Sequence, residues 1–192
     1  MIAKYRGLPR EVVFIFHHEP HASATEEGGA HGDGKDFVAA WTRLHTLFVE
    51  HGAHHSVGGP VFFGYCATMR QAENIEQDYC YPGDSYVDLF CHDRYNYGTN
   101  GGRNTWELFG EGDGALFGPF IRNVCETRQK RLLIGEVASG EMAGHSRDEW
   151  FRNMANFIKT DPYAQRWVIG FNYFHSIHTD TKGITNDWRI LG

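Results

Sequence analysis

Two glutamates follow apolar segments of the sequence in a pattern suited to acid–base chemistry. Glu19 ends the stretch EVVFIFHHE (11–19), and Glu136 lies near the end of RLLIGEVAS (131–139). An unpaired carboxylate inside a sheet is costly, so a glutamate there is normally either paired or used. Two carboxylates that converge over one cleft push their pKa values apart, leaving one protonated acid and one ionised nucleophile. Cleavage of a glycosidic bond requires such a pair.

Each glutamate also has a simpler interpretation. Glu19 could be a surface residue that caps the loop beginning at Pro20, and Glu136 could be the buried salt-bridge partner of Arg94. The sequence leaves both alternatives open.

The elements that would position these residues alternate along the chain. Five apolar runs are continuous, as in strands covered on both faces: 11–19, 60–68, 86–97, 131–139 and 166–175. Helical patterns occupy 36–53, 117–130 and 146–159, and Ser146 and Glu149 have capping-box spacing. This alternation predicts an α/β fold with a parallel sheet, in a single domain over residues 1–192.

Three long polar segments, predicted to be loops, follow the first, third and fifth of these strands. They are residues 24–36, 95–104 and 175–187. Ligands of α/β proteins bind at the carboxyl ends of the strands, so this is the expected position of a site.

Composition narrows the class of protein. The 192 residues carry a net charge of −6 with no run of Lys and Arg, which argues against a nucleic-acid partner. No segment approaches the roughly 20 apolar residues that cross a membrane, and the start does not resemble a signal peptide. Five Trp and nine Tyr suit a cleft that stacks on sugar rings. The four cysteines are expected to be mostly free, buried thiols.

The histidines raise the alternative of a metal-dependent hydrolase. They gather in HHEPH (17–21) and HGAHH (51–55). HHEPH follows a strand, where adjacent side chains such as His17 and His18 point to opposite faces, and its spacing differs from the H-E-x-x-H of zinc proteases. HGAHH is expected to be the solvated end of a helix. The sequence therefore predicts neither a metal nor another cofactor.

Four motifs, taken in order, resemble glycoside hydrolase family 26, the mannanase-type retaining enzymes built on a (β/α)₈ barrel. They are FIFHHEP (14–20), YPGDSYVDLFCHDRYNY (81–97), LLIGEVASGE and the closing FNYFH with NDWRI. The resemblance extends over nearly the whole chain from Val12. It implies β-linked polysaccharide substrates, chiefly mannan, with xylan and mixed-linkage glucan as variants.

The resemblance also implies catalytic roles. Glu19 would be the general acid/base at the end of barrel strand four, and Glu136 the nucleophile at the end of strand seven. Glu136 would attack the anomeric carbon while Glu19 protonates the leaving oxygen and then activates water. In this mechanism the two carboxyl groups lie about 5–5.5 Å apart.

Further residues are expected to bind the substrate. His18 resembles the histidine that hydrogen-bonds the sugar or the nucleophile, and Tyr95 the tyrosine that steadies the nucleophilic carboxylate. Phe174 or His175 would form an aromatic platform at the rim of strand eight. Trp106 and Trp188 lie in or beside rim loops. Each of them could either pack in the protein or stack on a sugar ring.

The chain departs from the family in length. Only ten residues precede the segment that would be strand four, whereas a (β/α)₈ barrel takes about 250 residues. We therefore expect an incomplete barrel of about five β/α units, with further chains or self-association covering its open edges. The alternative is a non-catalytic glycan-binding or structural subunit of a larger assembly such as a virion tail. Either interpretation suits an extracellular or virion-associated protein.

Overall fold

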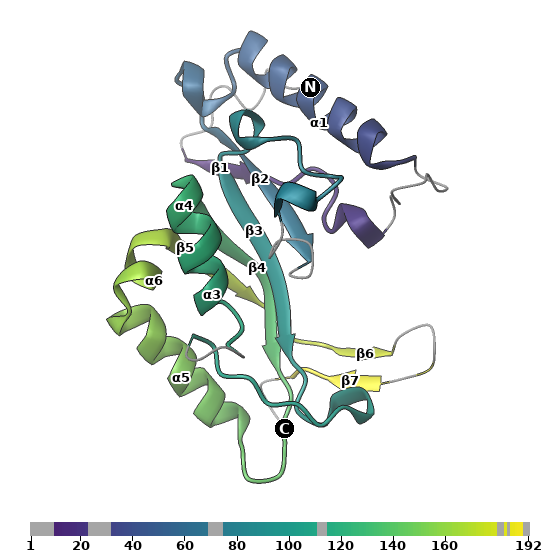
Figure 1. The fold of residues 1–192 in the computed structure, drawn as a ribbon, viewed down its shortest axis with the longest axis vertical. Helices are drawn as coiled ribbons and strands as arrows, with labels where there is room; N and C mark the ends of the chain where they lie inside the picture. The colour runs from purple at the N-terminus through teal and green to yellow at the C-terminus, as the bar shows by residue number, and fades with distance from the viewer. Residues whose placement is uncertain are drawn as a thin grey trace. The chain divides into compact units, whose positions relative to one another are not determined.

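The structure is a computed structural model that describes residues 10–22, 32–68, 75–110, 115–179, 183 and 185–189 (Figure 1). The chain divides into two compact units, Met1–His92 and Asp93–Gly192. The boundary falls within strand β3 (Leu89–Asn96), which therefore contributes residues to both units.

Five strands form one sheet with the order β1-β2-β3-β4-β5. Besides β3 these are β1 (Val12–Phe14), β2 (Val61–Thr68), β4 (Arg131–Ser139) and β5 (Val168–Tyr173). β1 pairs in parallel with β2, and β4 in parallel with β5. A separate antiparallel pair consists of β6 (Ile177–Thr179) and β7 (Thr185–Asp187).

Helices follow the strands along the chain. In the described residues they are α1 (Gly34–Glu50), α3 (Gly118–Phe120), the π-helix η7 (Ile121–Cys125), α4 (Glu126–Arg128), α5 (Arg147–Thr160) and α6 (Pro162–Trp167). Short 3-10 helices are η2 (Pro20–Ala22), η3 (His55–Val57), η4 (Ile75–Gln77), η5 (Asp84–Tyr86) and η6 (Asn100–Gly102).

Helix α1 supplies the aromatic core of the first unit. Asp33 caps its first turn in a capping box with Asp36. On its inner face Phe37, Trp41 and Phe48 are buried. Trp41 lies 5.7 Å from the ring of Phe63 on β2, and its indole N–H donates to the carbonyl of Tyr86 at 2.8 Å. The helix therefore covers β2 with rings whose polar group is satisfied.

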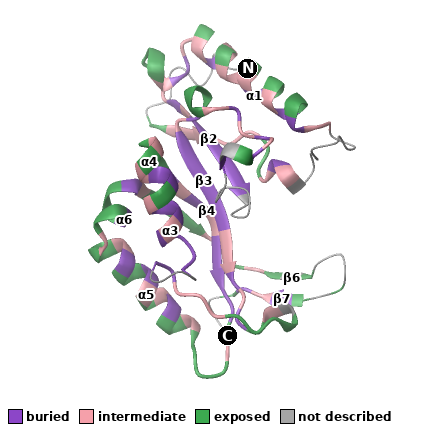
Figure 2. Ribbon diagram, in the orientation of Figure 1, coloured by how far each residue is buried: buried purple, intermediate pink, exposed green. Residues whose placement is uncertain are grey.

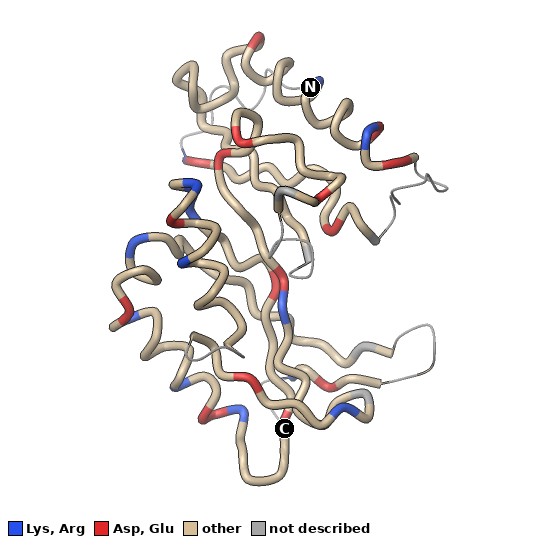
Figure 3. The backbone as a smooth tube through the Cα atoms, viewed as in Figure 1, with Lys and Arg blue, Asp and Glu red and all other residues tan. Residues whose placement is uncertain are grey.

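Helix α5 does the same for the second unit. Ser146 is its N-cap and accepts from the amide of Glu149, which is one half of the predicted capping box. Trp150, Met154 and Phe157 are buried on one side, so purple and green alternate along this helix in Figure 2. Trp150 and Phe157 both pack at 5.7 Å from the ring of Phe109. Most acidic and basic residues of this helix are exposed, and red and blue segments mark such residues along the backbone in Figure 3.

Several predicted elements end elsewhere. The first strand stops at Phe14 rather than at Glu19, because His17 and Glu19 adopt positive φ values that no strand allows. The predicted loop 175–187 contains the β6–β7 pair. The predicted helix 117–130 is interrupted by η7, and part of the predicted loop 24–36 lies outside the described residues.

The prediction of free, buried cysteines is confirmed. Cys66, Cys80, Cys91 and Cys125 are all buried and unbridged. Burial raises the pKa of Cys125 to about 12. Within the described residues, none of the helices has the length and apolar character to span a membrane.

Candidate active site

The backbone positions Glu19 in the first unit. The residue is half-buried and follows β1 in a bend where His17 has φ +56° and Glu19 has φ +49°. Its amide N–H donates to the carbonyl of Cys66, near the end of β2, at 3.2 Å. Left-handed conformations are uncommon for residues other than glycine and cluster at functional sites, where the surrounding structure holds them. Glu19 therefore lies at the carboxyl ends of β1 and β2, although it lies beyond the strand itself.

A side chain positions Glu136 in the second unit. Glu136 is half-buried within β4, and the hydroxyl of Tyr95 on β3 donates to its Oε2. A hydrogen bond to a carboxylate is stronger than one between neutral groups, so it holds the carboxylate in one orientation. The strand is paired with β5 on both sides of Glu136, at Ile134 and at Val137.

Aromatic rings hold Tyr95 in turn. The ring of Trp188, which is buried, lies 4.9 Å from that of Tyr95, and the ring of Phe174 meets it edge-on at 5.8 Å. Phe174 is itself fixed by an N–H···O bond to Val137 at 2.9 Å. The structure thus brings together Glu136, Tyr95 and Phe174, three of the residues selected from the sequence, and assigns Trp188 to packing beside Tyr95.

The remaining selected residues are more open. His18 and His175 are exposed. The half-buried ring of Trp106 stacks on His145, with centroids 4.9 Å apart and planes 15° apart. Its indole nitrogen is buried without a hydrogen-bond partner in the structure. Trp106 therefore packs against His145, whose side chain is 39% exposed.

A cavity of about 350 Å³, which was not predicted from the sequence, lies beyond the carboxyl end of β4. It is lined by Thr99, Glu141, Met142, Ala143, His145 and Ser146. The carbonyl of Glu141 accepts from both the amide and the hydroxyl of Thr99, which ties the loop after β3 to the loop after β4. A signal in the sequence was the glycine at 98, because a Cβ there would lie 2.3 Å from the Glu141 carbonyl.

Arg94 was expected to be a possible partner of Glu136. In the structure its guanidinium forms an ion pair with Glu107 at 2.6 Å. The side chain of Asn96, also on β3, makes two hydrogen bonds. Its Nδ2 donates to the Ser139 hydroxyl, and its Oδ1 accepts from the backbone amide of Glu107. These contacts connect β3, the segment around Glu107 and the end of β4.

Two groups of side chains within the first unit could hold a cation: His21 with Asp78 and Cys80, and His54 with His55 and Asp88. The prediction that HGAHH (51–55) is solvated surface is wrong for His54, whose side chain is only 3% exposed. His54 is buried because a carboxylate distant in the sequence, that of Asp88, accepts a hydrogen bond from it.

The expected separation of the Glu19 and Glu136 carboxyl groups stays a prediction, since the two residues belong to different units. Within its own unit, each glutamate lies where a parallel sheet presents its ligand-binding end.

Comparison with known proteins finds one partial match in sequence and several similar solved structures. No protein-family model matches the sequence. Endoglucanase H of Acetivibrio thermocellus is 31% identical over 111 residues, which is 57% of this chain and 11% of that protein. Among solved structures, the catalytic domain of a family 26 endo-β-1,4-mannanase from Bacillus sp. JAMB-750 matches with a TM-score of 0.52 and 17% identity, over 92% of this chain and 47% of that one. A Cellulomonas fimi endo-β-1,4-mannanase double mutant matches with a TM-score of 0.56 and 20% identity, over 96% and 40%.

The resemblance in fold to family 26 is confirmed. The five parallel strands with their helices form an incomplete (β/α)₈ barrel, as the sequence predicts. The chain spans less than half the length of these solved structures and about a tenth of the length of Endoglucanase H.

Proposed function

We propose that this chain carries the two catalytic carboxylates of a retaining glycoside hydrolase that acts on β-linked polysaccharide. Fold alone supports many chemistries, so the proposal depends on the site. The observation that carries it is the hydrogen bond from Tyr95 to Glu136, made at the ligand-binding end of β4 and supported by Trp188 and Phe174.

In the proposed mechanism, Glu136 is the nucleophile. Its ionised carboxylate attacks the anomeric carbon while Glu19 donates its proton to the leaving glycosidic oxygen. Glu19 then removes a proton from water, which attacks the glycosyl–Glu136 ester and releases a product of retained configuration. The Tyr95 hydroxyl holds one oxygen of Glu136 in place and so orients the carboxylate for attack.

The substrate is proposed to be mannan-like, with xylan and mixed-linkage glucan as variants. The aromatic residues Phe174 and Trp106, together with His18 and His175, would contact the sugar rings. Support comes from the fold relatives, which include endo-β-1,4-mannanases, and from the partial sequence match to an endoglucanase. No metal or other cofactor takes part in this mechanism.

The first test measures release of reducing sugar from mannan, xylan and mixed-linkage glucan. Glu136→Ala should abolish release, and Glu19→Ala should lower kcat by about 10²- to 10⁴-fold, the usual contribution of a general acid/base. Glu50→Ala, an exposed glutamate at the end of α1, is the matched control and should retain full activity. Turnover that survives Glu136→Ala would contradict the mechanism.

A second test assigns the two roles. An activated 2-deoxy-2-fluoro glycoside should leave a covalent adduct on the peptide that contains Glu136. With a substrate whose leaving group needs no protonation, Glu19→Ala should accumulate glycosyl-enzyme, which azide should then release with retained configuration. Glycan retention on an affinity gel, with neither adduct nor product, would favour the non-catalytic glycan-binding alternative.

A further inference from the structure

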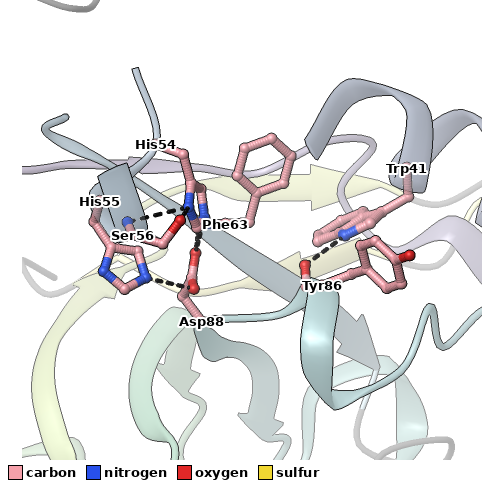
Figure 4. Close-up of polar contacts among 7 residues, drawn as sticks. All are labelled: Trp41, His54, His55, Ser56, Phe63, Tyr86 and Asp88. Atoms are coloured by element: carbon pink, nitrogen blue, oxygen red, sulfur yellow. Dashed lines mark hydrogen bonds and ion pairs between the residues drawn. The ribbon is translucent and has the colours of Figure 1, made fainter. Parts of the chain in front are cut away.

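A cluster of imidazoles surrounds one carboxylate at the amino ends of β2 and β3, the ends opposite to that of Glu19. His54 and His55 precede β2, and Asp88 immediately precedes β3. His54 Nε2 lies 2.9 Å from Asp88 Oδ2, and His55 Nε2 lies 2.7 Å from Asp88 Oδ1 (Figure 4). The mechanism proposed above uses none of these three residues.

We propose that His54, His55 and Asp88 form a binding site for a divalent transition-metal cation of the Zn²⁺ type. The three ligand atoms lie within 4.8 Å of one another. Two imidazoles and a carboxylate are a donor set that Zn²⁺ prefers, whereas Mg²⁺ and Ca²⁺ prefer oxygen donors alone. Binding at Zn–N distances of about 2.0–2.1 Å would require the two hydrogen-bonded contacts to Asp88 to open and the two imidazole nitrogens to converge on the ion.

The groups around the cluster already orient its members. The backbone amide of Phe63 donates to Asp88 Oδ2 at 2.6 Å, which fixes the carboxylate. The His55 ring stacks on Phe62, with centroids 4.3 Å apart and planes 9° apart. His55 is also 36% exposed at its side chain, so an ion can reach the site and retain a water ligand. Rigid, supported ligands with one open side are typical of metal sites.

Ser56 allows His54 to change its tautomer when the ion binds. In the metal-free state Nε2–H donates to the Asp88 carboxylate, so Nδ1 accepts from the Ser56 amide at 3.2 Å. A metal on Nε2 would move that proton to Nδ1, where the Ser56 hydroxyl oxygen, 2.8 Å away, can accept it, while the Ser56 amide gives up its hydrogen bond to Nδ1. The ring stays neutral and no proton is released. Such an outer partner typically contributes 10- to 100-fold, roughly, to metal affinity.

A third imidazole lies next to the cluster. The ring of His45 on α1 lies 4.4 Å from that of His54. His45 packs against His54 and is not one of the three proposed ligands.

The experiment is calorimetric titration of the chelator-stripped chain with Zn²⁺ alone and with Mg²⁺ alone. We expect one saturable Zn²⁺ site and no matching Mg²⁺ site. His55→Ala, a change at a partly exposed side chain, should weaken Zn²⁺ binding by more than about 100-fold, since it removes a direct ligand. Ser56→Ala should weaken it by about 10- to 100-fold. His51→Ala, at an exposed histidine of the same segment, is the control and should bind as the wild type does.

Spectroscopy of bound Co²⁺ distinguishes the proposed site from the other candidate group in the first unit, His21 with Asp78 and Cys80. Co²⁺ bound by Cys80 would show a thiolate-to-metal charge-transfer band, whereas Co²⁺ held by His54, His55 and Asp88 would not. Absence of Zn²⁺ binding to the wild type, equal binding of Zn²⁺ and Mg²⁺, unchanged affinity in His55→Ala, or a thiolate band for the tight site would each overturn the proposal.

Discussion

The two proposed catalytic glutamates are held by different parts of the molecule. Glu19 is placed by its backbone, in a bend that contains two left-handed residues. The amide of Glu19 donates a hydrogen bond to Cys66, near the end of β2. Glu136 is placed by its side chain, through the hydroxyl of Tyr95 inside the sheet. A backbone-placed group depends on how well the surrounding core holds the bend, whereas a side-chain-placed group depends on the groups that bind its side chain. Substitutions in each unit can separate these two dependences.

The largest effect is expected from the cores that support each glutamate. Trp41 and Trp150 are both fully buried, one in each unit. Trp41→Ala and Trp150→Ala should each lower the free energy of unfolding by about 3–5 kcal/mol. Because β3 contributes residues to both units, we expect both variants to unfold in a single denaturant transition. Two separate transitions, each moved by one variant only, would show that the units unfold independently.

The next largest effect, on kcat, is expected from removing the Tyr95 hydroxyl that donates to Glu136. Tyr95→Phe keeps the ring between Trp188 and Phe174 but removes the hydroxyl. Loss of a hydrogen bond to a charged group costs about 1.5–3 kcal/mol, so kcat should fall by roughly 10- to 150-fold with little change in KM. Tyr97→Phe is the matched control, since that ring also packs on Trp188. An equal loss in both variants would remove the special role of Tyr95.

The next prediction concerns the free energy of unfolding of the first unit, which should fall at acidic pH because of Asp88. Burial raises the pKa of the Asp88 carboxyl. Hydrogen bonds from His54, from the amide of Phe63 and from His55 outweigh burial and lower this pKa from 3.8 to about 2. Because the folded-state value is the lower one, this stabilisation is present above about pH 4 and is lost as the pH falls toward 2. It amounts to about 2 kcal/mol.

Denaturant titrations of the wild type and Asp88→Asn between pH 5 and pH 2.5 measure this contribution. The difference between them should shrink as the pH falls. The second unit offers a control in Asp148, which pairs with Arg152 while its side chain is 72% exposed. Asp148→Asn should be nearly neutral at every pH, because exposed pairs contribute little. A constant Asp88→Asn difference across this range would contradict the prediction.

The smallest effect concerns the bend before Glu19. A left-handed conformation costs a non-glycine residue about 1–2 kcal/mol, while glycine increases the entropy of the unfolded chain. His17→Gly should therefore raise the free energy of unfolding by between zero and about 1 kcal/mol. Gln129→Gly, at the left-handed cap of α4, is the counterpart in the second unit. A loss of more than about 1 kcal/mol in His17→Gly would mean that the His17 side chain stabilises the bend.

The sequence predicted the long elements better than their ends. The strand 131–139 has the predicted bounds, and Ser146 caps the predicted helix, because both signals are local. Glu19 was expected to end a strand, but no local pattern marks a left-handed glutamate. Burial of His54 was missed because it depends on Asp88, a contact across 34 positions. The cavity beyond β4 was missed for the same reason, since it requires two loops to meet.

The buried thiols give the chain internal reporters of its own opening. Cys80 belongs to the first unit and Cys125 to the second, and burial raises the pKa of each to about 12. The thiolate is the form that alkylating reagents attack, so neither sulfur reacts while its surroundings stay closed. The rate at which iodoacetamide marks each cysteine, read by peptide mass, therefore measures how often each unit exposes its interior without any label being engineered.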